Sequence, residues 1–109
     1  MGSGDDACVI MTTTNDPAEA DRLAEGLVRG GLAACVQSTP ITSHYLWEGK
    51  LERQAEQLLL IKTKADRFAE VEAYVRNHHS YEVPEILRLP ASGGSDGYLS
   101  WLRENSRGA

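Results

Sequence analysis

The sequence contains few cysteines and no long hydrophobic segment. Cys8 and Cys35 are its two cysteines, and they belong to neither a Cys-x-x-Cys pair nor a structural zinc spacing, which indicates a reducing compartment. No apolar run approaches the roughly 20 residues that a membrane helix needs, and the first residues lack the charged and apolar regions of a signal peptide. We therefore expect a cytoplasmic protein that does not associate with membranes.

An excess of basic residues is also missing. The chain has 11 Lys and Arg against 16 Asp and Glu, a formal net charge of −5. Nucleic-acid-binding proteins gain much of their affinity from clustered Lys and Arg, so we expect neither DNA nor RNA as a partner. The acidic balance fits a metal-handling surface, although charged side chains more often only solvate the outside of a domain.

The length is that of one domain. A chain of 109 residues with 41% apolar side chains can bury a conventional core without disulfides or a structural metal. We expect residues 7–109 to form this single domain, and residues 1–6 to be a disordered start or an expression scar.

Apolar patterning predicts a strand and then a helix in the first third of the chain. Residues 8–14 begin with a continuous apolar run, typical of a strand buried on both faces. The helix has Asp16 as its N-cap, Pro17 in its first position and Glu19 as the acidic partner of a capping box. It is expected to end at Gly30.

Two strands joined by a turn are predicted next. Residues 32–47 form a long strand pattern in which Pro40 removes a ladder donor, so this strand should lie at an edge or be bent. Residues 48–50 supply the turn, and residues 57–63 form a second buried strand. A long strand with an exposed edge is a natural place for another chain to pair.

The last third predicts a helix, a strand and a short terminal helix. The helix is capped by Asp66 and stops before Ser80. Residues 83–89 form the strand, and the terminal helix follows a glycine-rich loop with Ser95 as its N-cap.

The resulting order, βαββαβ plus a terminal helix, is that of the ferredoxin-like α+β fold, with an antiparallel sheet in the order 4-1-3-2. This order places the two continuously apolar strands at the centre and the proline-containing strands at the edges. The third strand then separates the backbones of Cys8 and Cys35 by roughly 9–10 Å, beyond the usual reach of a disulfide. We expect both thiols to be free.

Five segments carry a resemblance to a known family. The chain resembles the CutA family of divalent-cation tolerance proteins in segments 32–36 (LAACV), 45–50 (YLWEGK), 62–63 (KT), 79–86 (HSYEVPEI) and 98–102 (YLSWL). The resemblance implies a cytosolic homotrimer linked to tolerance of divalent metals and binding of copper, with no established catalytic reaction. Two positions depart from the family pattern: Thr12 stands where some members carry a proposed cysteine ligand, and Ser80 replaces a proline before Tyr81.

Three residues are candidate metal ligands. His78 and His79 could bind Cu²⁺ beside Glu82, because neutral imidazole and carboxylate both suit this ion. Alternatively, histidines in a last helical turn interact with the helix dipole, and adjacent helical positions point about 100° apart. The resemblance adds Cys35, but a free cysteine on a strand is more often a small buried hydrophobe, and the topology places it at the opposite end from the histidines.

The histidine-bearing end also gathers a set of aromatic and acidic side chains. These could line a cleft between subunits, or they could pack in a subunit interface, where Tyr and Trp are enriched; we favour the interface. The residues are Tyr45, Trp47, Glu56, Tyr81 and Glu82.

No residues have the arrangement of a nucleophile with a base, a phosphate loop or paired carboxylates. An acylphosphatase-like enzyme would need an Arg in an anion loop after the first strand, and residues 15–17 do not supply one. We therefore expect a protein that is not an enzyme. The main alternative is a regulatory module that binds a small ligand between the subunits of a ferredoxin-like trimer.

Overall fold

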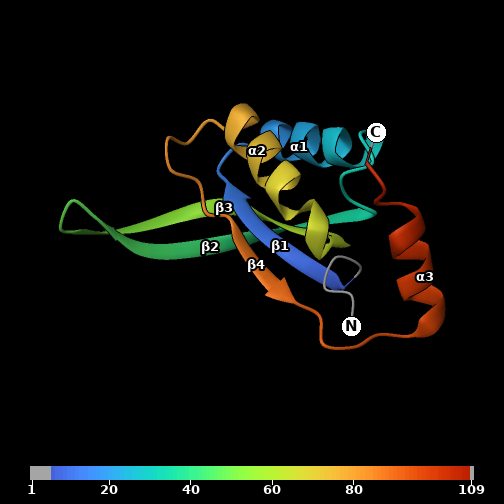
Figure 1. Ribbon diagram of the computed structural model, residues 1–109. Coiled ribbons are helices and arrows are strands. Elements are labelled where there is room, and N and C mark those ends of the chain that lie inside the picture. Colours follow the sequence, from blue (N-terminus) through green and yellow to red (C-terminus); the bar gives the residue numbers. More distant parts are fainter. Residues whose placement is uncertain (1–5, 109) are drawn as a thin grey trace.

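The computed structural model describes residues 6–108, which form an antiparallel sheet with two helices against one of its faces (Figure 1). Most of the predicted start at residues 1–6 lies outside the described residues. A third helix lies beside one end of the sheet. The elements in chain order are β1 (Ala7–Thr14), α1 (Pro17–Arg29), β2 (Cys35–Trp47), β3 (Lys50–Lys64), the short 3₁₀ helix η2 (Ala65–Arg67), α2 (Phe68–His78), β4 (Leu87–Pro90) and α3 (Asp96–Glu104).

The sheet has the order β2-β3-β1-β4, which confirms the predicted ferredoxin-like arrangement. β1 pairs with β3 from Ala7 opposite Lys64 to Thr14 opposite Gln57, and with β4 on its other side. β2 is an edge strand, as Pro40 predicts. β3 separates the strands that carry the two cysteines, and Cys8 and Cys35 are both free, as expected.

The β2–β3 hairpin projects beyond the rest of the molecule (Figure 1). Its pairing continues to Trp47 opposite Lys50, although β1 ends opposite Gln57. Residues 50–56 of β3 therefore pair only with β2 within the described part of the chain. At the tip, Glu48 and Gly49 have φ of 51° and 80°, the left-handed conformation that two-residue hairpin turns require.

The core lies between the sheet and helices α1 and α2. Its members come from the inward faces of β1 and β3 and from one apolar stripe on each helix, where side chains three and four residues apart share a face. Each is almost fully buried, which stabilises the fold by about 1.5–3 kcal/mol for a side chain of this size. The largest are Ile10, Leu23, Leu27, Leu59, Ile61, Val71 and Val75. Thr12 is also buried on this inward face.

Three strand predictions need correction. β2 begins at Cys35 rather than residue 32, because the N–H groups of Leu32 and Ala33 donate to the Leu27 carbonyl oxygen at the end of α1. β3 begins at Lys50 rather than residue 57, because the hairpin pairing supports a polar segment that has no continuous apolar pattern. β4 begins at Leu87 rather than residue 83, because residues 83–86 do not pair with β1. These four residues form part of the connection from α2 instead.

Three predicted caps also differ from the structure. Asp16 does cap α1 by accepting a hydrogen bond from the Ala18 N–H at 3.0 Å, but Glu19 does not complete a capping box. Asp66 lies within η2 and faces the Arg67 guanidinium at 3.6 Å instead of capping α2. Ser95 occupies the N-cap position of α3, but its side chain makes no capping hydrogen bond.

Helices α1 and α2 approach closely at Gly26. A Cβ added at this position would lie 2.7 Å from Cζ of Tyr74. We predict that Gly26→Ala destabilises the protein by about 1–3 kcal/mol, the usual cost of overpacking, although this change stabilises most helix interiors by roughly 1 kcal/mol. Urea unfolding would measure the difference.

The control is Gly26→Ala in a Tyr74→Ala background, where the substitution should become neutral or stabilising. The same loss of stability in both backgrounds would contradict the steric explanation.

None of the helices within residues 6–108 is long and apolar enough to cross a membrane.

Candidate functional site

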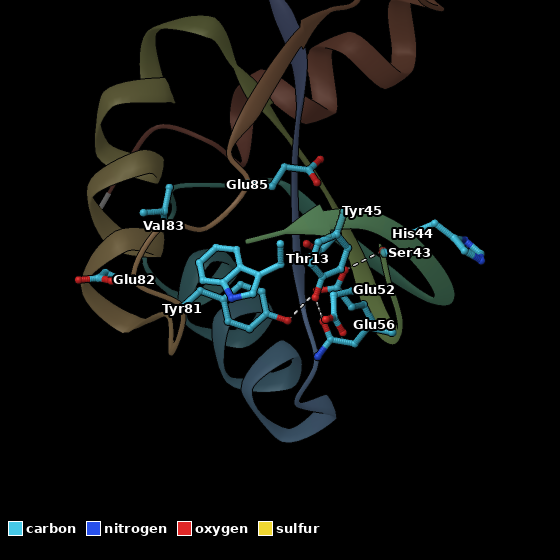
Figure 2. Close-up of a pocket in the computed structure, with 12 residues that line it drawn as sticks. Thr13, Ser43, His44, Tyr45, Glu52, Glu56, Tyr81, Glu82, Val83 and Glu85 are labelled. Carbon is cyan, nitrogen blue, oxygen red and sulfur yellow. Dashed lines mark hydrogen bonds between the residues drawn. The ribbon is translucent and has the colours of Figure 1, made fainter. Parts of the chain in front are cut away.

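A cleft of about 880 Å³ opens between the β2–β3 hairpin and the connection that follows α2. It contains all five aromatic and acidic residues that the sequence places at this end, together with side chains from β1, β2, β3 and the connection (Figure 2). The lining residues are Thr13, Ser43, His44, Tyr45, Trp47, Glu52, Gln54, Glu56, Tyr81, Glu82, Val83 and Glu85.

Glu56 lies in the floor of the cleft and is 8% exposed. Its Oε1 accepts a hydrogen bond from the Ser43 hydroxyl at 2.7 Å, and its Oε2 accepts one from the Tyr81 hydroxyl at 2.6 Å. Burial and the Glu56 carboxylate raise the pKa of Tyr81 well above its usual value, so this phenol stays protonated and keeps donating. Two hydroxyl groups from separate elements thus hold one buried carboxylate.

The imidazole of His79 positions Tyr81. Its Nδ1 accepts a hydrogen bond from the Tyr81 N–H at 2.9 Å, and its Nε2 lies 2.7 Å from the carbonyl oxygen of Thr13. Because a carbonyl only accepts, Nε2 carries the proton in this arrangement. The ring is completely buried. Both nitrogens of this predicted metal ligand are therefore already bonded within the protein.

Glu19 ties the same connection to α1. Its Oε2 accepts hydrogen bonds from the hydroxyls of Thr14 at 2.7 Å and Ser80 at 3.1 Å, and it lies 3.4 Å from Nδ1 of His79. Burial alone would raise the pKa of Glu19, but hydrogen bonds from the Thr14 hydroxyl and from the backbone and hydroxyl of Ser80 lower it below the usual value. The Ser80 hydroxyl thus makes a hydrogen bond that holds the segment leading to Tyr81 against α1.

His78 differs from its neighbour. It ends α2 with Nδ1 2.8 Å from the Tyr74 carbonyl oxygen and with its ring stacked on Tyr74 at a centroid distance of 4.1 Å. The side chain is exposed, and within residues 6–108 its Nε2 has no hydrogen-bond partner. This nitrogen is free to bind an external group.

The structure does not bring the three predicted metal ligands together. Cys35 begins β2, whereas the cleft residues Tyr45 and Trp47 end it. Thr12 is buried in the core, away from solvent. Within residues 6–108, no group of three or more His, Cys, Asp and Glu side chains is arranged to hold a metal ion.

The cleft is electronegative. Four of its lining residues are glutamates, and none is Lys or Arg. Burial, followed by the charge of Glu56, raises the pKa of Glu85. Tyr45, Tyr81, Glu52 and Glu56 converge in the centre of the view, whereas the side chains of His44 and Glu82 point outward (Figure 2). The Tyr45 hydroxyl donates to Oε1 of Gln54 at 2.8 Å, which fixes that ring.

Sequence reasoning found the aromatic and acidic cleft residues but missed the groups that hold them. Glu19 and Ser80 are 61 positions apart, and Thr13 and His79 are 66 apart, so no local pattern connects them. The one signal available was the run of threonines at the end of β1, because hydroxyl groups at buried positions need hydrogen-bond partners.

Comparison with protein families matches residues 8–105 to CutA1 divalent ion tolerance protein. The divalent-cation tolerance protein CutA of Pectobacterium atrosepticum is 45% identical over 103 residues, which cover 94% of each chain. The chloroplastic CutA of Arabidopsis thaliana is 41% identical over 100 residues. Those residues cover 91% of this chain but 55% of the Arabidopsis protein, so the chain spans about half of that relative's length.

Solved structures show the same fold. CutA1 from Oryza sativa superposes with a TM-score of 0.92 at 37% identity, covering 97% of this chain and 98% of the other. A protein from Archaeoglobus fulgidus, described as a periplasmic divalent cation tolerance protein CutA, gives a TM-score of 0.90 at 38% identity, covering 93% and 99%.

The Glu19 network predicts a specific acid sensitivity. A carboxyl whose pKa is lowered by folding stabilises the protein above its unfolded value of about 4.5, and this contribution is lost as pH falls through the lower folded value. We predict that Glu19→Gln lowers the free energy of unfolding at neutral pH by about 1–3 kcal/mol. We also predict a shallower loss of stability below pH 4.5 than in the unmodified protein.

Urea unfolding at a series of pH values would measure both effects. Glu25→Gln is the matched control, because the Glu25 side chain lies on α1 with 70% exposure. Equal pH dependence in the unmodified protein and in Glu19→Gln would rule out this role for Glu19.

Proposed function

This chain belongs to the CutA1 divalent ion tolerance family, and we propose that it works as a non-enzymatic cytoplasmic homotrimer that binds cations, Cu²⁺ among them. The observation that carries the proposal is the cleft with four glutamates and without Lys or Arg among its lining residues. A concave surface with one sign of charge raises the local concentration of ions of the opposite sign. Cations are therefore the ligands that this end of the molecule attracts.

For Cu²⁺, we assign His78 as the donor. Its free Nε2 is a nitrogen ligand that suits this ion, and Glu82 supplies carboxylate oxygens three positions beyond the buried His79. Two such donors do not make a complete preformed site, and no set of three exists within the described residues. We propose that a neighbouring subunit completes the coordination. Cys35 contributes little within one subunit because it lies at the far end of β2.

The trimer is supported by the hairpin. Leu46, Trp47 and Leu51 surround its tip with exposed fractions of 73%, 63% and 72%, and apolar side chains gathered in this way are typical of subunit interfaces. Residues 50–56 of β3 also leave one edge without a partner strand in the described part of the chain. An unpaired edge of this kind is a template for pairing with another copy.

A second function is favoured by the size of the cleft. A volume of about 880 Å³ falls in the range of small-molecule sites and is far larger than a metal ion needs. A regulatory module that binds a small ligand beside the subunit boundary fits this volume.

We predict that light scattering at micromolar concentration gives about three times the chain mass of 11.9 kDa. Trp47→Ala should weaken assembly by about 2 kcal/mol or more, the range of interface hot spots, and sedimentation should then show monomers on dilution. Trp101→Ala is the control, because this residue lies on α3 and is 45% exposed. A mass near 12 kDa for the unmodified protein, or a Trp47→Ala trimer that resists dilution, would contradict the interface.

Titration with Cu²⁺ tests the metal donor. We predict that His78→Ala weakens Cu²⁺ binding at least about tenfold, since even outer-shell partners contribute that much, and that binding by the unmodified protein weakens in acid because a coordinating imidazole must be neutral. Isothermal calorimetry would measure the affinity. His44→Ala tests the exposed imidazole that lines the cleft, and Cys35→Ser tests the thiol. Loss of binding in either of these, with His78→Ala unaffected, would overturn the assignment.

A further inference from the structure

We propose that the cleft binds a small organic ammonium ion, with Glu56 as its counter-charge and the rings of Tyr45, Trp47 and Tyr81 as its walls. This proposal names a ligand class for the small-molecule function above, on which it rests, and it is independent of the Cu²⁺ assignment to His78.

No cation among the described residues balances the charge of Glu56. Glu56 as a residue is 8% exposed, yet no Lys, Arg or His nitrogen lies within 4.0 Å of its carboxylate among residues 6–108. Its two hydrogen bonds come from neutral hydroxyl groups. Buried charges in proteins are normally paired with an opposite charge. An external cation would supply the missing charge.

Other carboxylates line the cleft together with Glu56. Glu52 and Glu85 line the same cleft, and burial first, then the charge of Glu56, raise the pKa of Glu85. Like charges at close range repel each other, and a cation between them relieves the repulsion. A positive group that enters the cleft therefore reduces the repulsion between these carboxylates.

The hydrogen bonding of Glu56 favours an organic ion over a bare metal ion. Both oxygens of Glu56 already accept a hydroxyl hydrogen bond, and no three-donor arrangement exists in the described residues. A divalent metal needs several converging ligands. An ammonium group needs only lone pairs that remain free on such oxygens, since an ionised carboxylate has about four acceptor positions.

The aromatic walls favour the same class. Three aromatic rings line the cleft, and Tyr81 and Tyr45 are held in place by hydrogen bonds to Glu56 and Gln54. Ring faces attract ammonium groups through cation–π interaction, and sets of aromatic rings are a recurrent means of binding them. In Figure 2 the two tyrosines converge toward Glu56 and Glu52, so one ligand can contact a ring and a carboxylate at the same time.

The test uses the full chain with Trp101→Phe, which leaves Trp47 as the single tryptophan. The probe is n-butylammonium chloride, added at constant ionic strength against sodium chloride, and n-butanol is the neutral analogue. We expect a saturable change in Trp47 fluorescence with the ammonium salt and none with sodium chloride or butanol. Glu56→Gln should weaken the response at least about tenfold, the loss of about 1.4 kcal/mol expected for one charge-assisted hydrogen bond.

Glu52→Gln provides a second variant should Glu56→Gln fail to fold, and it should also weaken binding. Glu104→Gln on α3 is the matched control and should leave the response unchanged. The proposal is overturned if butylammonium gives no saturable change, if butanol gives the same change, or if the cleft variants bind as tightly as the control. If Cu²⁺ displaces butylammonium in a manner that depends on Glu56, the cleft is a metal site and the organic class is wrong. Cu²⁺ binding that depends on His78, without an ammonium response, overturns this inference alone.

Discussion

The bridge made by the His79 imidazole is the interaction on which the cleft depends. The ring joins the carbonyl of Thr13 at the end of β1 to the N–H of Tyr81 in the connection after α2. The hydrogen bond from this N–H fixes the backbone of Tyr81, and the Tyr81 hydroxyl in turn donates to Glu56 on β3. Through Tyr81, the His79 imidazole thus determines where the Glu56 carboxylate lies on β3. The Thr13 carbonyl that the ring faces determines the tautomer of His79.

The network around this bridge is polar and largely buried, with the side chains of His79 and Glu19 0% and 5% exposed, which makes it specific as well as costly to disturb. Each donor has an acceptor from a different element, since Thr14, Glu19 and Ser80 come from β1, α1 and the connection. A partly satisfied buried network is less stable than an apolar core, whereas a satisfied one favours a single arrangement. This explains how residues 79–86, which contain little regular structure, can place cleft side chains at defined positions.

The same residues of the β2–β3 hairpin suit both contact with another subunit and the lining of the cleft. Its exposed apolar tip and unpaired β3 edge suit contact with another copy of the chain, while Tyr45 and Trp47 also line the cleft. Aromatic side chains serve both purposes, because they bury a large area and present a ring face or a polar group. Assembly and ligand binding are therefore expected to be coupled through this hairpin, since a neighbouring subunit would cover part of the surface that a ligand approaches.

The sequence alone determined the order of elements, the sheet topology and the end of the molecule where the cleft lies. These follow from local signals: continuous apolar runs in the central strands, Asp16 and Pro17 at the start of α1, and Pro40 in the edge strand. Only the tertiary structure decided the length of β3, the late start of β4, the true partners of Glu19 and Asp66, and the burial of His79. The physical reason is the separation of the interacting residues along the sequence, because periodicity and capping act between residues a few positions apart. The hydrogen bonds that join Glu19 to Ser80 and His79 to Thr13, by contrast, exist only once distant segments have packed against each other.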